Sequence, residues 1–285
     1  MIRFMMMLGC VFIMFSAANA QAETPLAQSR SFVVSGVLLN QGNNPLMSRF
    51  SQWLAKHSGL RLSTRYADSY QSLSDQLRQQ PNALAWTCGA PFVEDHVANG
   101  QQLVAVPLFK GAPVYHSLVI TRRGRQEKSL ADFKGQGFAY ADPRSNSGYI
   151  APAYALKKNG IDIKTYFRYR MHTGLHEYAI EAVLFGLADV ANIDEYVLVE
   201  YFKTHPDANK RLAIIERFGP YPFTPIVAAK GVPKETIVRL QRALLGMREN
   251  KEGAEILAHF GLDGFVTKDA SFYEPIATML RELNP

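Results

Sequence analysis

The stretch GFAYADPRSNSGYIAPAYALKKN, residues 137–159, predicts a strand, a turn and a helix in direct succession. Its first four residues form a short apolar run, Asp142 and Pro143 are turn-forming residues, and Gly148–Asn159 has the spacing of a helix. Strands that lead through a polar loop into a helix are the units from which mixed α/β proteins are built. The stretch therefore predicts a sheet covered by helices.

The same alternation continues on both sides of this stretch, and it predicts a largely parallel sheet. Pro220, Pro222 and Pro225 are expected to interrupt the chain before its last strand, and Pro275 is expected to kink the last helix. We expect strands at 31–39, 60–66, 83–87, 103–109, 115–121, 137–140, 167–171, 188–193, 212–216 and 226–229, and helices at 46–57, 69–79, 91–99, 129–133, 148–159, 177–185, 195–205, 234–250, 254–260 and 271–283.

Two domain arrangements fit this alternation. The first is one large doubly wound domain. The second is a pair of α/β lobes, each with its own sheet, joined by crossing segments at 115–121 and 223–229, with the C-terminal helices packed on the first lobe. The sequence has no long linker between the two halves, so the second arrangement predicts a hinged cleft.

Residues 1–20 are typical of a cleaved secretory signal. Arg3 supplies a positive charge, Phe4–Phe15 is apolar, and the small residues that end at Ala20 match an A-x-A cleavage site. The apolar run is shorter than the roughly 20 residues that a membrane-spanning helix needs. We therefore expect cleavage after Ala20 and a secreted protein, with a retained anchor as the alternative.

The net charge limits the classes of binding partner that we expect, and the cysteine count limits the possible disulfides. The formal net charge is +6 without a run of five like charges, so the sequence does not indicate nucleic-acid binding, although the surplus suits an anionic ligand. The chain has two cysteines, and Cys10 leaves with the signal. Cys88 then has no partner for an intrachain disulfide, so its thiol is either buried and inert or reactive and used.

The sequence lacks the common catalytic motifs, namely the G-x-S-x-G elbow, the Walker loop, a G-x-G-x-x-G after a strand and H-E-x-x-H. His172 and His176 are four residues apart, but Gly174 between them argues against a shared helix face and therefore against a metal site. Nothing near Cys88 supports a cysteine–histidine nucleophile pair. We predict no catalytic residue, no cofactor and no metal.

The best candidate site is the loop that follows strand 137–140. Free backbone N–H groups at a helix start attract anions, and Ser145 and Ser147 add hydroxyl donors. Ligands of open α/β sheets bind at the carboxyl ends of strands, where this loop lies. The alternative is an ordinary helix cap, because serine and asparagine often cap helices.

An ordered set of segments resembles the periplasmic phosphate/phosphite/phosphonate-binding family of ABC transporters. The resemblance extends from about residue 30 to about residue 270 and implies a two-lobed periplasmic-binding-protein type II fold, with lobe 1 at 21–118 plus 225–285 and lobe 2 at 119–224. The segments are AWTCGAP (85–91), PVYHS (113–117), SLADFKG (129–135), DPRSNSG (142–148), HEYAIEAV (176–183) and GLADVA (186–191).

The resemblance also implies a ligand site between the lobes. Asn146 joins the two serines as a donor, and Asp194, or its neighbour Glu195, is the candidate acceptor for a protonated ligand oxygen. His176 either donates to the anion or caps its helix. The remaining candidates are Tyr115 and Tyr149, which offer hydroxyls or rings to an organic tail or belong to the core, and Thr87 and Cys88 of the first-lobe loop.

This sequence departs from the family pattern at three places. Many members have a small hydroxyl residue where Asn146 stands, and Phe92 and Val93 stand where a ligand tyrosine can occur. Cys88 is the third departure, because a thiolate in this loop suits a soft oxyanion such as arsenite.

We therefore expect a monomeric periplasmic receptor without catalysis that captures a phosphonate, phosphite or phosphate for an ABC transporter permease. The alternative is a sensory binding protein, for an oxyanion such as arsenite, that signals to a membrane histidine kinase. In either case the expected mechanism is closure of the lobes on the ligand.

Overall fold

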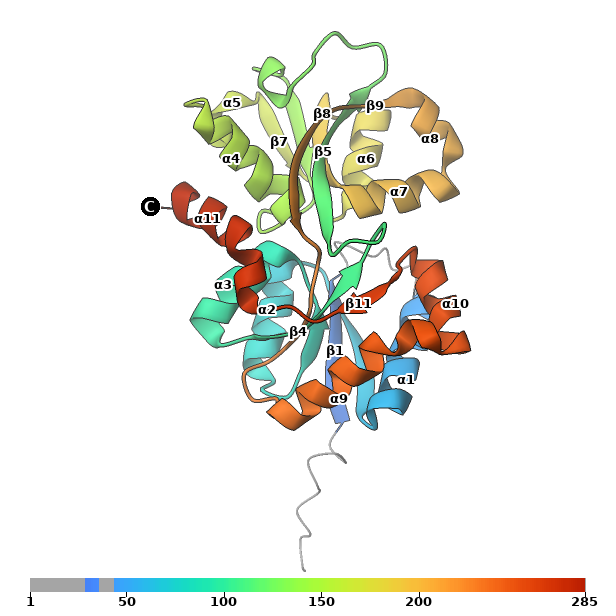
Figure 1. The fold of residues 1–285 in the computed structure, drawn as a ribbon. Coiled ribbons are helices and arrows are strands. Elements are labelled where there is room, and N and C mark those ends of the chain that lie inside the picture. Colours follow the sequence, from blue (N-terminus) through green and yellow to red (C-terminus); the bar gives the residue numbers. More distant parts are fainter. Residues whose placement is uncertain (1–28, 36–43, 285) are drawn as a thin grey trace, which may run out of the picture.

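The computed structural model describes residues 29–35 and 44–284. The expected secretory signal and residues 36–39 of the strand expected at 31–39 lie outside these residues. The described chain forms two α/β lobes, one above the other in Figure 1, each built on a sheet with flanking helices. This confirms the two-lobed alternative.

The sheet of lobe 1 has six strands in the order β11-β4-β10-β3-β1-β2. β1 pairs in parallel with β2 and β3, whereas β10 is antiparallel to β3 and β4, and β11 is antiparallel to β4. The strands are β1 (Ser29–Ser35), β2 (Arg61–Ala67), β3 (Leu84–Trp86), β4 (Gln102–Leu108), β10 (Ile226–Ala228) and β11 (Gly264–Val266).

The sheet of lobe 2 has five strands in the order β7-β6-β8-β5-β9. β6 is parallel to β7 and β8, but β5 is antiparallel to β8 and β9. The expectation of a largely parallel sheet therefore holds for β1, β2 and β3 in lobe 1 and for β6, β7 and β8 in lobe 2, whereas β5 and β10, which enter from the other lobe, are antiparallel to their neighbours. The strands are β5 (Val114–Arg122), β6 (Gly137–Tyr140), β7 (Tyr169–His172), β8 (Val190–Asp194) and β9 (Leu212–Pro222).

The chain crosses between the lobes beside β5 and at the end of β9. At the crossing, the Phe223 N–H donates to the Pro113 carbonyl at 2.9 Å. Pro220 and Pro222 do not interrupt the chain as expected, since β9 continues to Pro222. β9 is an edge strand, where a proline without an N–H breaks no ladder hydrogen bond.

The helices cover both sheets. Their bounds are α1 (Asn44–Ser58), α2 (Tyr70–Gln79), α3 (Gly89–Asn99), α4 (Ala151–Lys158), α5 (Ile163–Tyr166), α6 (His176–Leu184), α7 (Glu195–Thr204), α8 (Pro206–Arg211), α9 (Lys234–Leu245), α10 (Lys251–Phe260) and α11 (Glu274–Leu283), with short turns η2 (Leu130–Asp132), η3 (Asn146–Ile150), η4 (Met247–Glu249) and η5 (Ala270–Tyr273). Sequence reasoning missed the short elements β11, α5 and α8. In the part of the chain that is described, no helix is long and apolar enough to cross a membrane.

The C-terminal helices differ from the sequence prediction in two ways. The helix expected at 234–250 ends at Leu245 and is followed by η4, and Pro275 lies in the first turn of α11 rather than at a kink within it. α9 and α10 pack on lobe 1, as expected. α11, however, contacts both α3 of lobe 1 and α4 of lobe 2, so it lies across the lobe junction (Figure 1).

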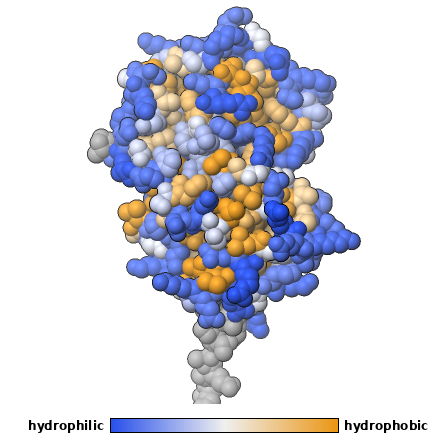
Figure 2. All heavy atoms as spheres, viewed as in Figure 1, coloured by the Kyte–Doolittle hydropathy of each residue, from blue (hydrophilic) through white to orange (hydrophobic). Residues whose placement is uncertain are grey.

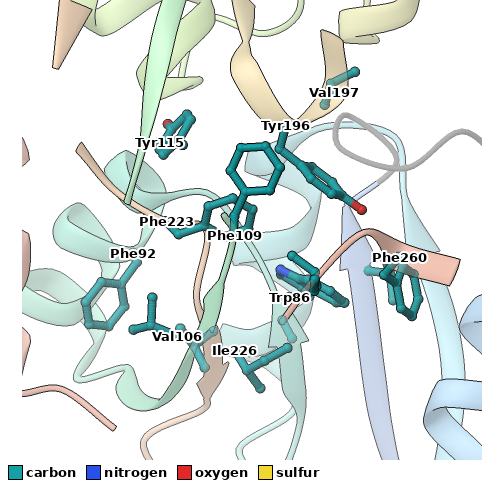
Figure 3. Packing of buried hydrophobic residues seen from close by; sticks show 14 of the residues in the cluster. Trp86, Phe92, Val106, Phe109, Tyr115, Tyr196, Val197, Phe223, Ile226 and Phe260 are labelled. Atoms are coloured by element: carbon teal, nitrogen blue, oxygen red, sulfur yellow. The ribbon is translucent and has the colours of Figure 1, made fainter. Parts of the chain in front are cut away.

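Aromatic side chains fill the junction between the lobes (Figure 3). Phe109 follows β4, Phe223 follows β9 and Tyr196 lies on α7, and their ring centroids are 5.5–5.7 Å apart. All three are nearly completely buried. Aromatic pairs in edge-to-face geometry contribute about 0.5–1.5 kcal/mol each beyond the area that they bury. On the face shown in Figure 2, apolar patches occur on both lobes among mostly polar side chains.

Candidate functional site

The loop after β6 leads directly into a helix start. The Ser145 Oγ accepts a hydrogen bond from the Gly148 N–H at 3.0 Å, which caps η3, a single π-helical turn that continues into α4. The helical structure therefore begins at Asn146, two residues before the predicted start. Ser145, Asn146 and Ser147 are completely buried, although they lie in a polar loop.

Asn146 connects this loop to the other lobe. Its backbone N–H donates to the Cys88 sulfur at 3.4 Å, and its side-chain amide donates to the Tyr115 hydroxyl at 3.0 Å. Cys88 follows β3 of lobe 1 at the start of α3, and Tyr115 lies on β5. Three residues predicted from distant parts of the sequence are therefore in contact.

A chain of hydrogen bonds from the lobe 2 sheet holds the backbone of Ser147. The Ser147 carbonyl accepts from the Ser117 hydroxyl at 2.7 Å, and the Ser117 oxygen accepts from the Asn192 amide at 2.9 Å. Sequence reasoning missed Ser117 and Asn192, which lie on neighbouring strands β5 and β8. The Ser147 hydroxyl is left free to bond elsewhere.

Four buried polar atoms around these contacts lack a hydrogen-bond partner within the described chain: Tyr70 Oη, Thr87 Oγ1, Asn146 Oδ1 and Ser147 Oγ. An unsatisfied buried polar group costs about 1–3 kcal/mol, so native proteins rarely bury several together. Tyr70 is the first residue of α2, packs with Cys88, and was not predicted. Two of these atoms belong to lobe 1 and two to lobe 2.

His176 lies beside the same loop at the start of α6. Its Nδ1 atom accepts from the Asp194 N–H at 3.4 Å, and its Nε2 atom is 3.3 Å from the Ser145 Oγ. Burial lowers the pKa of His176 to about 3, so the ring is neutral and carries its proton on Nε2. Since Ser145 Oγ then accepts from both His176 and Gly148, its own O–H remains available as a donor.

Asp194 is the buried carboxyl group of the site. It ends β8 and caps α7 by accepting the Tyr196 N–H at 2.8 Å. Burial raises the pKa of Asp194 to about 7, against the opposing effect of hydrogen bonds from Tyr196 and Val197. Asp194 therefore caps α7, as one of its two alternatives predicted, and its buried carboxyl group lies among the candidate site residues.

Glu195, the other acidic candidate, belongs to a different set of contacts. It accepts from the Lys110 ammonium at 2.7 Å and from the His116 backbone N–H at 3.1 Å. Burial raises the pKa of Glu195, but the bonds from Lys110 and His116 outweigh it and hold the pKa below its usual value. Glu195 thus ties α7 to the segments that cross between the lobes.

Tyr149 and Phe92, which were also considered as ligand positions, make their contacts away from the loop. The Tyr149 hydroxyl accepts from the exposed Arg170 at 3.2 Å, and its ring lies 4.9 Å from that of the half-buried Tyr140. Phe92 is buried in lobe 1 against Tyr273, with 4.9 Å between the ring centroids. The contacts recorded for Tyr149 therefore do not join it to the buried residues around Asn146.

The structure separates the two histidines considered as metal ligands. His172 is exposed at the end of β7 and stacks on Tyr140, whereas His176 is buried. No group of three His, Cys, Asp or Glu side chains is arranged to hold a metal ion among residues 29–35 and 44–284.

The buried residues that converge at the lobe junction are called the polar cluster below. They come from the ends of β2, β3 and β8, from β5, from the loop after β6 and from the start of α6. The members are Tyr70, Thr87, Cys88, Tyr115, Ser145, Asn146, Ser147, His176 and Asp194.

Comparison with known proteins identifies the family. A family model described as the periplasmic substrate-binding protein of phosphonate ABC transporters matches residues 39–273. The chain belongs to this family.

Members of the phosphonate-binding family resemble the chain in sequence and in fold. The phosphonates-binding periplasmic protein of Escherichia coli is 24% identical over 254 residues, which cover 87% of this chain and 74% of that protein. The binding component of a phosphonate ABC transporter from Pseudomonas aeruginosa has a TM-score of 0.81 at 23% identity and 88% and 85% coverage. PhnD1 of Prochlorococcus marinus, solved with methylphosphonate, has a TM-score of 0.80 at 19% identity and 90% and 98% coverage.

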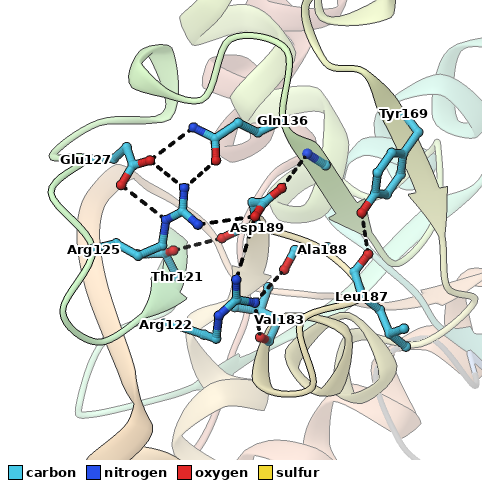
Figure 4. Close-up of polar contacts among 11 residues, drawn as sticks. Thr121, Arg122, Arg125, Glu127, Gln136, Tyr169, Val183, Leu187, Ala188 and Asp189 are labelled. Carbon is cyan, nitrogen blue, oxygen red and sulfur yellow. Dashed lines mark hydrogen bonds and ion pairs between the residues drawn. The ribbon is translucent and has the colours of Figure 1, made fainter.

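The family motifs have separate structural roles. In the loop motif, a Cβ at Gly148 would lie 3.1 Å from the Ser145 Oγ and 3.3 Å from the His176 ring, so glycine allows these groups to approach. In the G-x-x-D-V-A motif, Asp189 lies at the opposite end of β8 from Asp194 and accepts from Gly137 N–H at 2.9 Å and Arg125 at 3.2 Å (Figure 4). Asp189 therefore anchors the lobe 2 sheet and does not belong to the polar cluster.

Proposed function

We propose that the protein is a periplasmic receptor that encloses a phosphonate, phosphite or phosphate between its lobes and delivers it to an ABC transporter permease. In this proposal lobe 1 comprises residues 21–118 plus 225–285, and lobe 2 comprises residues 119–224, with the first boundary falling inside the crossing strand β5 of the lobe 2 sheet. The cluster members are the proposed contacts of the oxyanion, and Tyr149 is proposed as a contact of an organic tail. The protein acts as a monomer, without catalysis.

The observation that carries this proposal is the set of unpartnered buried polar atoms from both lobes. A tetrahedral oxyanion has three or four oxygens that each accept hydrogen bonds. The hydroxyls of Tyr70, Thr87 and Ser147 and the free O–H of Ser145 supply uncharged donors from two sides. Binding such an ion removes the cost of leaving these groups unpaired, so it favours the closed arrangement.

The cluster also contains an acceptor for a protonated ligand. Because the pKa of Asp194 is about 7, its carboxyl group is divided between the protonated and ionised forms near neutral pH. One proton shared between Asp194 and a ligand oxygen avoids placing two negative charges in a buried site. A singly protonated phosphonate, phosphite or phosphate is the form we expect to bind.

The location of the protein follows from the family and from the first residues. The family is periplasmic, and residues 1–20 have the pattern of a secretory signal. We propose cleavage after Ala20, with the described part of the chain acting in the periplasm beside the permease.

The arsenite alternative receives less support from the structure. Coordination of arsenic needs a thiolate, but burial raises the pKa of Cys88 to about 11 despite hydrogen bonds from Asn146 and Ala90. The thiol also serves as an acceptor for the Asn146 N–H at 3.4 Å. Cys88 is therefore proposed as an uncharged contact between the lobes.

Isothermal titration calorimetry tests the proposal directly. We expect the purified protein to bind methylphosphonate, 2-aminoethylphosphonate, phosphite or phosphate, and not arsenite. Thr87→Val should weaken this binding, whereas Ser271→Ala, at an exposed serine outside the cluster, should leave it unchanged. Lack of heat with all four phosphorus oxyanions would contradict the proposed ligand class, and arsenite binding that is lost in Cys88→Ser would replace it with the alternative.

A further inference from the structure

Two charged residues directly before the cluster loop contact the opposite lobe. Asp142 and Arg144 flank Pro143, and the Asp142 carboxylate accepts from the Arg144 N–H at 2.7 Å through Oδ1. Its other oxygen, Oδ2, accepts from the Tyr70 N–H of lobe 1 at 3.2 Å. The Tyr70 N–H is one of the free donors of the first turn of α2, where a carboxylate is favoured.

The Arg144 side chain makes the larger contact. Its Nε atom donates to the Glu94 carboxylate at 2.8 Å, and Nη2 lies 3.4 Å from Asp95 Oδ1. Nη1 donates to the Ser74 hydroxyl at 2.7 Å and is 3.5 Å from the Tyr70 carbonyl. Only 17% of the Arg144 side chain is exposed, so this guanidinium from lobe 2 is embedded in α2 and α3 of lobe 1.

The acceptor site in lobe 1 is built independently of lobe 2. The buried Asp95 carboxylate accepts from Asn99 at 3.1 Å, from Gln101 at 3.2 Å and from the Ser74 hydroxyl, all within lobe 1. Arg144 is the cation that the described structure places against it. Separation of the lobes would leave Asp95 with neutral donors only, so electrostatic attraction favours return of Arg144.

The two charged residues also hold Tyr70 from both sides of its backbone. Asp142 binds its N–H and Arg144 approaches its carbonyl, while the Tyr70 hydroxyl remains one of the unpartnered atoms of the cluster. Because Pro143 restricts the backbone between them, Asp142 and Arg144 move together with the adjoining Ser145. The contacts of Asp142 and Arg144 therefore position Tyr70 of lobe 1 relative to Ser145 of lobe 2.

We propose that Asp142 and Arg144 form an interlobe latch, which stabilises the closed arrangement before any ligand binds and positions Tyr70 against the cluster loop. The latch acts through other residues and is a positioning element rather than a ligand contact. A receptor that is closed for a larger fraction of the time binds its ligand more tightly by that same factor. The latch therefore sets affinity without contributing to ligand specificity.

The rate at which the Cys88 thiol reacts measures how often the two lobes separate in the ligand-free protein. Cys88 is 1% exposed and lies against Asn146 of lobe 2, so a thiol reagent such as 5,5′-dithiobis(2-nitrobenzoate) reaches it when the lobes separate. All proteins compared in this experiment also carry Cys10→Ser, so that Cys88 is their single cysteine. We expect Arg144→Gln to raise the reaction rate about tenfold, because charge-assisted hydrogen bonds are lost.

Matched variants separate opening from general destabilisation. Glu94→Gln keeps the shape of the acceptor side chain and should also raise the rate of the thiol reaction. The variant that combines Glu94→Gln with Arg144→Gln should react little faster than Arg144→Gln alone, because the two substitutions remove the same contact. Lys210→Gln, which loses only the exposed pair with Asp207 in lobe 2, should leave the rate unchanged. Unaltered rates in both Arg144→Gln and Glu94→Gln would overturn the latch, as would rates that rise only in proportion to a global loss of stability in urea.

The ligand arm of the test rests on the proposed function. With methylphosphonate as probe, Arg144→Gln should weaken binding by the factor by which it lowers the closed fraction, which is smaller than the rise in the thiol rate when the unaltered protein is mostly closed. Methylphosphonate should slow the thiol reaction in both proteins. A thiol rate that saturating methylphosphonate leaves unchanged would contradict the coupling. If methylphosphonate does not bind the unaltered protein, the proposed ligand fails, and the ligand-free thiol rates still decide the latch.

Discussion

The Nδ1 atom of His176 lies 3.4 Å from the backbone nitrogen of Asp194, and this contact determines which ring nitrogen carries the proton. A backbone N–H can only donate, so Nδ1 accepts and the proton of the neutral ring is on Nε2. Nε2 in turn faces Ser145 at 3.3 Å. Two residues predicted separately from the sequence are therefore parts of one hydrogen-bond chain that orients the Ser145 hydroxyl.

We predict that His176 stays neutral down to pH 5. Burial lowers its pKa to about 3, while the unfolded chain takes up a proton near pH 6.5. The folded state therefore loses stability as the pH falls below 6.5, and His176→Gln should lose less over the same range. Nitrogen-15 NMR of the ring should show the Nε2–H tautomer throughout; a His176 titration near pH 6.5 would contradict the assignment.

We predict the opposite pH effect for Asp194. Its folded pKa is raised to about 7 by burial, above the ordinary value of 3.8 for an aspartate side chain, so the folded state holds a proton that the unfolded state has released. Its stabilising contribution is complete below pH 3.8 and is lost as the pH rises through about 7, a change of about 2–4 kcal/mol. Asp194→Asn retains an oxygen for the Tyr196 N–H, so urea unfolding from pH 5 to 8 should show a flatter profile. Parallel profiles for the two proteins would show that the carboxyl group is ionised when folded.

Much of the fold was predictable because it depends on local pattern. The β6 strand was predicted at its exact bounds, since an apolar run ended by Asp142-Pro143 leaves little freedom. The antiparallel direction of β5 and β10 was not predicted, because it depends on which lobe each strand comes from. The proline rule failed in β9 for a related reason: Pro220 and Pro222 are tolerated at a sheet edge, and the sequence does not show which strand is the edge.

The site was only partly predictable because its members come from distant positions. The loop 145–147 carries its own signal, a helix start after a strand. Tyr70 carries no such sequence signal, because its neighbours predict only an ordinary helix start. The fold alone places it beside Cys88. Tyr149 shows the reverse case: it adjoins the loop in sequence, but helical geometry turns it toward Arg170.

Ser147→Ala should affect stability and binding in opposite directions. The Ser147 hydroxyl is buried and has no hydrogen-bond partner among residues 29–35 and 44–284, so its removal should stabilise the ligand-free protein by about 1 kcal/mol. Binding of methylphosphonate should weaken by about 1.5–3 kcal/mol, because a hydrogen bond to a charged ligand is lost. Ser117→Ala is the contrasting control: its hydroxyl bonds to Ser147 and Asn192, so ligand-free stability should fall. Calorimetric binding combined with thermal unfolding measures both quantities.

The Ser147 prediction extends to its neighbour. Asn146→Ala added to Ser147→Ala should weaken binding further, by a few kcal/mol in total. It also removes the amide that donates to Tyr115 at 3.0 Å, so the gain in ligand-free stability should disappear. An unchanged affinity in the double variant would reject the loop as the ligand site.

Asp189→Asn should separate stability from binding. The carboxylate accepts from the Gly137 N–H and from Arg125 at the end of lobe 2 remote from the cluster, and side chain exposure of 23% limits solvent screening. Loss of the charge should lower the free energy of unfolding by about 1–3 kcal/mol. Affinity for methylphosphonate, measured well below the unfolding temperature, should change less than twofold. Asp207→Asn, an exposed aspartate paired only with Lys210, controls for surface charge. A large loss of affinity in Asp189→Asn without a loss of stability would mean that this end of the sheet communicates with the site.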